Sequence, residues 1–395
     1  MPRFSIVVPT YNGAAHIREC LASALGQGPS DLEVIVVDDL SSDDTTALAR
    51  SVAAADPRVR VIERDENGGT LRARRDGVLA SKGDYVLLLD QDDELAPGAL
   101  EAVDAALAAA SDPDILHFGV RVVAENDAAS QAAAGMAGFL TPQPRRLEKD
   151  KILVAQFAET GGFDWHVHHK ALRGELARRA WGSAADVRLT LSDDLYASLM
   201  LCSLARSYVA VADAPWYVYH LGRGETFGEA LTLADVRSMS ERDLAAWELA
   251  RAFAAAGAAP RPDWPERLAD VRDRLAEHVM NELHDGLPRE LWHEAHEAVL
   301  ERWPADAVAA ELCRFVRDRA YALYDARSYP APDDELHELV SEKRRACALV
   351  EGEGSRRYRE MRAAAERHLA DLEALRPARG PLAALRSLLR RAPRG

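Results

Sequence analysis

The sequence lacks the features that mark secreted, zinc-finger and membrane-spanning proteins. Its 395 residues contain four cysteines, Cys20, Cys202, Cys313 and Cys347, which lie far apart in the chain and form no Cys-x-x-Cys pair. This spacing indicates neither a zinc site nor a disulfide framework, and we expect reduced, buried thiols in a cytoplasmic protein. No segment reaches the ~18–20 apolar residues of a membrane-spanning helix, and the apolar run before Pro9 is too short for a signal peptide.

Positive charge is also scarce. The chain has 49 Lys and Arg residues against 64 Asp and Glu, a formal net charge of −15. Nucleic-acid binding relies on a positive surface, so we predict no nucleic-acid partner. The tail, residues 374–395, is strongly basic, and leucines recur there at helical spacing. This tail is predicted either to lie on an anionic membrane surface or to be a solvated, partly disordered end.

Short apolar segments alternate with amphipathic helical patterns at the start of the chain. Residues 4–8, 33–37, 58–62 and 84–89 have the composition of buried strands, and helical patterns such as 70–80 lie between them. Strands that alternate with helices predict an α/β fold, a mostly parallel sheet with helices on both faces. In such sheets, ligands bind at the carboxyl ends of the strands.

The later part of the chain is less regular. Polar, alanine-rich residues 124–147 are broken by proline, which predicts a loop or flap. Strands are predicted at 115–123 and 207–212, and helices at 97–110, 149–157, 170–179 and 192–204. From about residue 231 the composition favours helices. We predict an α/β domain over 1–228, a helical domain over 229–373 and the basic tail.

Carboxylates gather where two of the predicted strands end. Four acids, Asp90, Asp92, Asp93 and Glu94, follow one strand, and the pair Asp38-Asp39 follows another. Acids this close repel each other, and their oxygens suit Mg2+ or Mn2+ bridging to a diphosphate. The alternatives are an acidic loop favoured by a helix dipole and a helix cap at Asp38 or Asp39. Better caps follow at residues 41–43, which leaves Asp39 free to accept from a nucleobase N–H.

Four segments in this order resemble the family 2 glycosyltransferases, which have a GT-A fold. They are Phe4-Ser-Ile-Val-Val-Pro-Thr-Tyr-Asn12, Val37-Asp38-Asp39 with Ser42, Ala73-Arg74-Arg75-Asp76-Gly77, and Gly83-Asp84-Tyr85 running to Asp90-Gln91-Asp92-Asp93. Weaker similarity to wall- and capsule-polymer members reaches residue 228. It rests on His169-Lys170-Ala-Leu-Arg173, Ser192-Asp193-Asp194-Leu195 and Trp216-Tyr-Val-Tyr-His220. The helical C-terminal third lies outside the resemblance.

The resemblance implies a metal-assisted, inverting transfer of a sugar from a nucleotide-sugar, with a UDP-sugar as the expected donor. The acceptor would be a hydroxyl of a glycan, a lipid-linked intermediate or a small natural product. Nucleotide-sugar binding is assigned to Pro9, Thr10, Tyr11, Asp39, Arg74, Asp90 and Gln91. Within this set Thr10, Tyr11 and Asp39 would hold the nucleobase, Arg74 the base or diphosphate, and Asp90 the ribose or a metal-bound water. Asp92 would ligate Mn2+ or Mg2+, which offsets charge on the leaving diphosphate.

An inverting displacement also needs a base that takes the proton of the acceptor hydroxyl. The resemblance points to Asp194, with Asp193 beside it, at the start of the predicted helix 192–204. The helix dipole favours an ionised carboxylate there. Asp193 stands where the family often has Glu, which bears on how the acceptor is held. The alternative is that both residues only cap the helix after Ser192.

Histidines give two further hypotheses. His220 stands where the family more often has Arg, and it is either a third metal ligand or a donor to the diphosphate together with Arg223. Its alternative is a structural hydrogen bond. The run Trp165-His166-Val167-His168-His169 has no ligand partners at helical spacing, so lining of the acceptor side or plain packing is favoured over a transition-metal site.

Two other function classes compete with the glycosyltransferase interpretation. A nucleotidyltransferase would carry a glycine-rich, basic loop after the first strand, and Tyr11-Asn12-Gly13-Ala14 is not such a loop. A non-catalytic scaffold would not need Asp39, Asp92 and Asp194, all of which are present. The helical domain is predicted to shape the acceptor site or to mediate self-association into a homo-oligomer.

Overall fold

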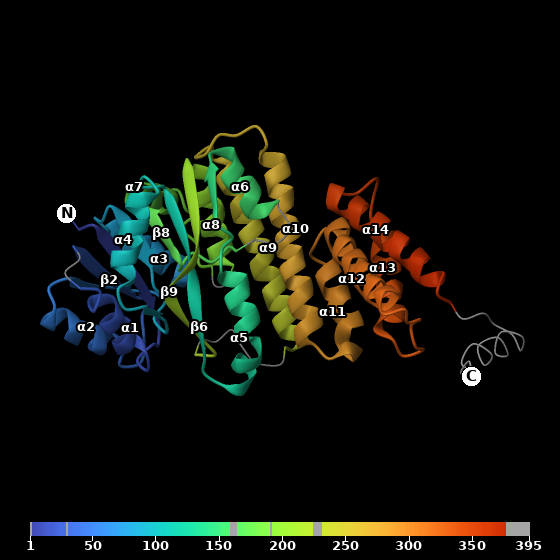
Figure 1. The fold of residues 1–395 in the computed structure, drawn as a ribbon, viewed down its shortest axis with the longest axis horizontal. Coiled ribbons are helices and arrows are strands. Elements are labelled where there is room, and N and C mark those ends of the chain that lie inside the picture. Colours follow the sequence, from blue (N-terminus) through green and yellow to red (C-terminus); the bar gives the residue numbers. More distant parts are fainter. Residues whose placement is uncertain (1, 29–30, 159–163, 190–191, 224–230, 377–395) are drawn as a thin grey trace, which may run out of the picture. The chain divides into compact units, whose positions relative to one another are not determined.

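The computed structural model describes residues 2–28, 31–158, 164–189, 192–223 and 231–376 (Figure 1). The chain forms two compact units, residues 1–230 with 242–271 and residues 231–241 with 272–395. Helices α9 (Leu233–Ala255) and α10 (Trp264–Gly286) contribute to both units. The basic tail beyond residue 376 lies outside the described residues. The domain boundary predicted at residue 228 stays a prediction, and contacts group 242–271 with the first unit.

The described residues of the first unit form a nine-stranded sheet. Its order is β3-β2-β1-β4-β8-β6-β9-β5, and β7 also pairs with β9. The parallel strands are β3 (Val59–Glu63), β2 (Leu32–Asp38), β1 (Phe4–Thr10) and β4 (Tyr85–Leu88). The mixed half contains β8 (Lys170–Arg173), β6 (Ile115–Ala124), β9 (Ser207–Leu221) and β5 (Glu94–Leu95). The long neighbouring arrows in Figure 1 are β6 and β9, which pair in parallel.

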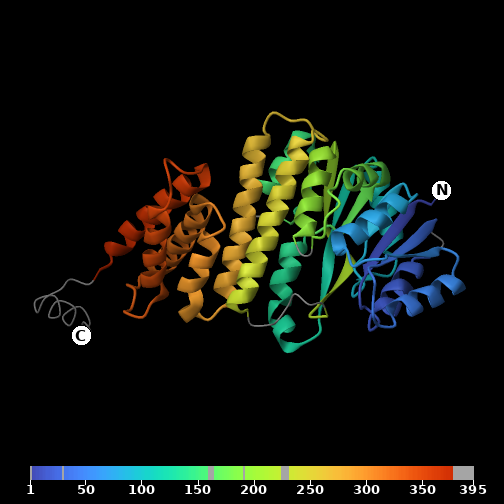
Figure 2. The same cartoon turned by 180° about the vertical axis from the view of Figure 1, so that it is seen from behind.

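Helices cover both faces of the parallel half. Phe4, Ile6 and Val8 of β1 share one core with helices α1 (Ile17–Leu25), α2 (Thr45–Ala55) and α4 (Ala99–Ala109). Val7 faces the other side, beneath α3 (Thr70–Ala80). Figure 2 shows the same ribbon from behind. Because both faces are covered, the central strands carry continuous apolar runs, residues 6–8 of β1, 34–37 of β2 and 85–88 of β4. The predicted α/β architecture is confirmed.

The prediction of a loop over residues 124–147 is wrong. The segment contains helix α5 (Asp127–Leu140) and strand β7 (Arg145–Glu148). The Asn126 side chain caps α5 by accepting from the Ala129 backbone N–H. The alanines that follow are strong helix formers, and they outweigh the polar composition on which the loop prediction rested.

The prediction of one helix over residues 170–179 is also wrong. Residues Lys170–Arg173 form strand β8, which pairs antiparallel with β4 and β6, and helix α7 (Gly174–Gly182) follows it. Pairing with β4 and β6 therefore determines the conformation of these four residues, although their local pattern favours a helix. The remaining helices of this unit, α6 (Asp150–Phe157) and α8 (Asp193–Leu204), agree with the predicted ranges.

The second unit is helical, as predicted. It contains η1 (Arg289–Leu291), α11 (Trp292–Leu300), α12 (Ala305–Asp325), α13 (Glu335–Ala348) and α14 (Arg356–Glu373). Cys313 and Cys347, distant in the sequence, are neighbours here, with 3.9 Å between their sulfur atoms. All four cysteines are free. In the ranges that the structure describes, no helix is both long and apolar enough to cross a membrane.

Close packing of α3 on the sheet generates a stability prediction. A Cβ atom at Gly77 would lie 2.3 Å from Cγ1 of Val7 and 3.0 Å from Cγ2 of Val37. We expect Gly77→Ala to lower the free energy of unfolding by about 1–3 kcal/mol, because the helix would have to move away from the sheet. Urea unfolding followed by circular dichroism measures the change.

The matched control is Gly138→Ala in α5, where a Cβ would meet nothing within 4 Å. That substitution should leave stability unchanged or raise it by up to about 1 kcal/mol, since alanine favours the helix. Equal unfolding midpoints for the two variants would contradict the packing argument.

Candidate active site

The candidate site lies where three parallel strands end. Thr10, the last residue of β1, pairs with Asp38, the last residue of β2. On the other side of β1, Val7 pairs with Leu88 at the end of β4, and the acidic residues 90–94 follow. The two acidic strand ends are therefore not neighbours in the sheet, because β1 lies between them. They still share one edge, where parallel α/β sheets bind ligands.

Arg74 links the predicted donor site to the predicted base. This side chain comes from α3 and is 4% exposed. Its Nη2 donates to Asp90 at 2.8 Å, and its Nη1 donates to Asp193 at 2.8 Å and also to Asp194. Burial alone would lower the pKa of Arg74, but the three carboxylates outweigh burial and hold it well above its ordinary value. Arg74 therefore pairs with three carboxylates of the protein. Its predicted contact with the nucleobase or diphosphate stays a prediction.

Asp193 and Asp194 begin α8 next to this arginine. Burial raises the pKa of Asp193 to about 7, against the lowering effect of Arg74. Asp194 is more exposed, with 17% of its side chain accessible against 8% for Asp193. Among the described residues, Arg74 is the only side chain that donates to Asp194, at Oδ1. The second carboxylate oxygen of Asp194 is thus available to an acceptor hydroxyl.

In the acidic loop, residues 90–94, the neighbouring carboxylates Asp92 and Asp93 differ in their hydrogen bonding. Asp93 accepts from the Tyr217 hydroxyl at 2.7 Å and from the backbone N–H of His220 at 2.8 Å. Burial, and then the charge of Asp92, raise its pKa well above the ordinary value. Asp92 has no side-chain hydrogen bond or ion pair among the described residues, and burial followed by Asp90 raises its pKa as well. A half-buried carboxylate without a counter-ion fits the predicted Mn2+ or Mg2+ ligand.

Gln91 holds the loop after β1. Its Oε1 accepts from the Thr10 hydroxyl and from the Tyr11 backbone N–H, and its Nε2 donates to the Tyr11 carbonyl at 3.0 Å. A Cβ on Gly13 would lie 2.0 Å from Gln91 Oε1, so a larger residue there would displace the Gln91 side chain. Pro9 is buried in the sheet, whereas Tyr11 is 46% exposed and open to a ligand. Gln91 therefore orders Thr10 and Tyr11, the predicted nucleobase contacts.

Asp39, expected from the sequence to be free to accept from a nucleobase N–H, already has partners within the protein. Its two oxygens accept from the backbone N–H groups of Gly68 at 2.9 Å and Gly69 at 2.7 Å, and Arg64 Nε lies 2.9 Å from Oδ1. Asp39 thus fixes the loop that enters α3. Its predicted contact with a nucleobase stays a prediction. The capping alternative does not hold for Asp38 either, because Asp44 is the N-cap residue of α2. Asp38 instead accepts from the backbone N–H and the hydroxyl of Ser41 and from the Thr46 hydroxyl.

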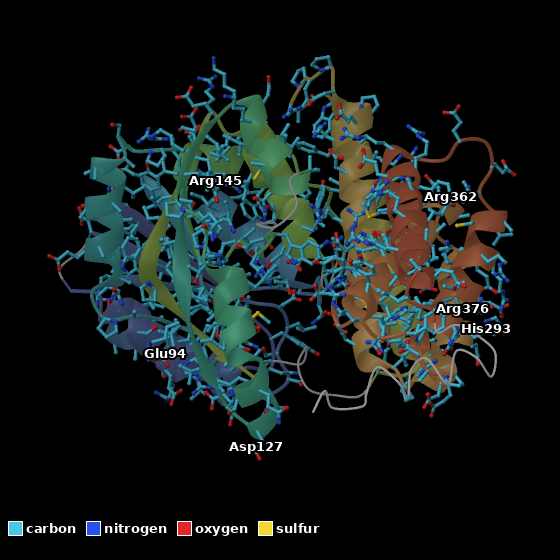
Figure 3. The ribbon with its side chains drawn as sticks, turned by 45° about the vertical axis from the view of Figure 1, so that its right-hand side comes forward. Glu94, Asp127, Arg145, His293, Arg362 and Arg376 are labelled. Atoms are coloured by element: carbon cyan, nitrogen blue, oxygen red, sulfur yellow. The ribbon has the colours of Figure 1, made fainter. Side chains whose placement is uncertain are left out.

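His220 lies between two glutamates. Its Nδ1 is 2.6 Å from Glu125 and its Nε2 is 2.7 Å from Glu94, which is labelled in Figure 3. Arg223 joins them, with Nε 2.9 Å from Glu125 and Nη1 3.5 Å from the Asp92 carbonyl. Both ring nitrogens therefore face carboxylates, and the structural hydrogen bonds weighed in the sequence are present. The metal-ligand and diphosphate hypotheses for His220 stay predictions.

Three residues around the site escape sequence reasoning. Tyr217 binds both Asp93 and the Asp90 backbone N–H, Glu125 pairs with His220, and Arg64 pairs with Asp39. Tyr217 lies within the aromatic segment that resembles the family, but its role depends on β9 passing beside the acidic loop. Glu125 and Arg64 occupy segments with no recognisable motif.

Comparisons with known proteins agree with this geometry. Residues 5–159 match the family model "Glycosyl transferase family 2". The chain is 29% identical over 254 residues to the succinoglycan biosynthesis protein ExoO of Rhizobium meliloti, covering 62% of this chain and 67% of ExoO. It is 35% identical over 104 residues to the GalNAc(5)-diNAcBac-PP-undecaprenol beta-1,3-glucosyltransferase of Campylobacter jejuni, covering 26% of this chain and 34% of that protein.

The extent of these matches differs between relatives. The chain spans about two thirds of ExoO but only 10% of the chondroitin synthase of Pasteurella multocida, to which it is 41% identical over 101 residues. Among solved structures, S. aureus TarS 1-349 has a TM-score of 0.53 at 17% identity, covering 92% of this chain and 91% of TarS 1-349. The same fragment in complex with UDP-GlcNAc has a TM-score of 0.51 at 18% identity, covering 92% of each chain. At this identity the likeness confirms the GT-A fold alone.

The family match decides between the function classes raised by the sequence. It covers the segment that contains β1, β2, β4 and the acidic loop, the elements on which the glycosyltransferase interpretation rested. Neither the nucleotidyltransferase nor the scaffold alternative gains support from it. Residues 5–159 therefore carry a family 2 glycosyltransferase domain, which supports a glycosyltransferase enzyme.

Proposed function

We propose that this chain transfers a sugar from a nucleotide-sugar to an acceptor hydroxyl with inversion at the anomeric carbon. The observation that carries the proposal is the contact of Arg74 with Asp90 on one side and with Asp193 and Asp194 on the other. Arg74 brings a donor-side acid and a candidate base within reach of one guanidinium. A single in-line displacement needs these two functions to be close together.

Asp194 is the proposed general base. In the displacement, the acceptor oxygen bonds to the anomeric carbon while the bond from that carbon to the diphosphate breaks. The electron pair of the broken bond leaves with the nucleoside diphosphate, and Asp194 takes the hydroxyl proton. Arg74 orients Asp194 through Oδ1, which leaves Oδ2 for the proton. Buried Asp193, with its raised pKa, positions the same arginine.

Donor binding is proposed at the loop after β1 and at the acidic loop. Thr10, Tyr11 and Asp39 would hold the nucleobase, and Asp90 the ribose or a metal-bound water. A Mn2+ or Mg2+ ion bound at Asp92 supplies charge neutralisation for the diphosphate. His220 and Arg223 stand at the same loop and are proposed to approach the diphosphate. The carboxylate excess here supports a cation, because Arg74 and Arg223 are outnumbered by the acids around them.

We propose a UDP-sugar as the donor to test first and a polysaccharide or lipid-linked glycan as the acceptor. ExoO is named for succinoglycan biosynthesis, and the Campylobacter enzyme is named for an undecaprenol-linked acceptor. Both names support this acceptor class. The catalytic domain is proposed to end near residue 228. The helical residues 229–373 would then shape the acceptor side or mediate self-association, and the tail would contact an anionic membrane surface.

Substitutions at two aspartates separate donor binding from chemistry. We expect Asp92→Asn to lose the part of UDP binding that depends on Mn2+, because it removes the only unpaired carboxylate of the acidic loop in the described structure. Asp194→Asn should bind UDP normally and lower kcat by about 10²–10⁴-fold, the usual contribution of a general base. Calorimetry with UDP, GDP and dTDP, with and without Mn2+, measures binding, and release of nucleoside diphosphate measures transfer.

Asp325→Asn, at an exposed site on α12, is the matched control and should change neither quantity. The division of labour fails if Asp92→Asn and Asp194→Asn lose binding equally. The proposed function itself fails if none of the three nucleotides binds.

Donor binding should also depend on pH. The pKa of Asp92 and of Asp93 is raised in the folded protein, so both carboxyls hold protons at higher pH than ordinary aspartates do. A metal ligand must be ionised, so metal-dependent UDP affinity should keep rising with pH above the range in which ordinary aspartates titrate, by up to about tenfold per pH unit for each proton released. Calorimetry in buffers of different ionisation enthalpy counts these protons. Affinity that stays constant above that range would contradict the raised pKa values.

A further inference from the structure

A second group of potential metal ligands lies away from the acidic loop. His117 of β6 meets Asp164 and His169, which precede β8, and all three side chains are buried. The Nε2 atoms of His117 and His169 lie 3.1 and 2.7 Å from Oδ2 of Asp164. The sequence places Asp164 and His169 in one histidine-rich segment, and the third residue of the group, His117, comes from the distant strand β6.

More nitrogen atoms surround Oδ2 of Asp164 than this oxygen can accept hydrogen bonds from. Lys170 Nζ lies 3.1 Å from the same Oδ2, so three nitrogen atoms surround one oxygen with two lone pairs. Oδ1 is already engaged by the backbone N–H and the ring of His166. Neither His117 Nε2 nor His169 Nε2 makes a hydrogen bond of acceptable geometry. Direct pairing with Asp164 therefore leaves two buried ring nitrogens unsatisfied.

The other ring nitrogens have partners that suit a metal site. His117 Nδ1 lies 2.5 Å from the Tyr208 hydroxyl, and His169 Nδ1 lies 3.1 Å from His168 Nδ1. When these Nδ1 atoms carry the protons, the Nε2 lone pairs both point toward Asp164. Burial lowers the pKa of His169 to about 4 and that of His117 well below its ordinary value, so both rings are neutral at pH 7. Neutral imidazole is the form that binds a metal.

We propose that His117, Asp164 and His169 bind one divalent transition-metal ion of the zinc class. Two imidazole nitrogens and one carboxylate oxygen favour such an ion, whereas Mg2+ and Mn2+ at Asp92 would rely on oxygen ligands. Ligand atoms at about 2.0–2.1 Å from a tetrahedral ion lie about 3.3 Å apart. The separations of 2.7 and 3.1 Å would therefore lengthen by a few tenths of an ångström when the ion enters. The ion replaces two poor contacts to Oδ2 with coordinate bonds, and Lys170 remains as a partner of Asp164.

The proposed ion would help to position Tyr217 and, through it, the acidic loop of the candidate active site. His168, between the ligand His169 and the rest of the segment, stacks on Tyr217 with ring centroids 4.5 Å apart. The Tyr217 hydroxyl in turn donates to Asp93 at 2.7 Å. An ion that fixes residues 164–169 against β6 therefore supports Tyr217 and the acidic loop. It takes no part in the displacement.

Metal analysis in the Asp92→Asn background tests the proposal, because that variant removes the main ligand expected of the donor-site cation. After treatment with a chelator and exposure to Zn2+ or Co2+, we expect about one bound equivalent by mass spectrometry of the metal. Bound Co2+ should show the visible absorption of a four-coordinate N/O site. The further substitutions His117→Gln and His169→Gln should reduce the bound metal at least tenfold.

Two variants control for nonspecific loss and for the competing ammonium. His368→Gln, on α14, should keep the full metal content. Lys170→Gln should keep or tighten metal binding, since it removes the cation that competes for Asp164. Absence of bound metal in the Asp92→Asn protein, or full metal content after both histidine substitutions, would overturn the proposal. The cobalt spectrum is measured on the Asp92→Asn protein, which keeps His117, Asp164 and His169. The proposal therefore remains testable even if the histidine variants misfold. UDP binding of the wild-type chain tests the glycosyltransferase proposal separately.

Discussion

The site depends on one buried guanidinium. Arg74 is 119 and 120 positions from Asp193 and Asp194 in the sequence, yet it donates to both and to Asp90. A buried charge that loses one partner typically costs about 3–5 kcal/mol, so α3, α8 and the acidic loop are constrained to stay together. Asp39 supports the position of α3 in the same way. Its two oxygens accept from the backbone N–H groups of Gly68 and Gly69 and so fix the loop from which α3 starts. Fold stability and catalytic geometry therefore rest on the same contacts.

The carboxylates of the site follow from this constraint in two groups. Asp90, Asp193 and Asp194 share Arg74, and Asp93 is held by Tyr217 and the His220 backbone. Asp92 forms no ion pair in the described structure, and burial, followed by the charge of Asp90, raises its pKa. Evolution could remove this charge by substituting an amide, but an amide would be a weaker metal ligand. The unpaired carboxylate is thus better explained by an external cation than by folding.

The sequence predicted those parts of the molecule in which local pattern and tertiary structure agree. The apolar strands of the parallel half, the helix over 70–80 and the acidic strand ends were recognisable because burial on both faces leaves a continuous apolar run. The errors occurred where another force decides: alanine propensity and the Asn126 cap in α5, and sheet pairing in β8. Contacts between distant segments, such as Arg74 with Asp194 or His117 with Asp164, have no periodicity and leave no local signal.

The same reasoning separates the two groups of metal ligands. At the acidic loop, oxygen atoms exceed the available cations, which suits an ion that arrives with a diphosphate and leaves with it. In the histidine cluster, nitrogen atoms exceed the lone pairs of Asp164, and all three candidate ligands are buried, which suits an ion held permanently. Tyr217 lies between them, stacked on His168 and bonded to Asp93. A fixed ion on one side of Tyr217 can therefore set the geometry for an exchangeable ion on the other without sharing a ligand with it.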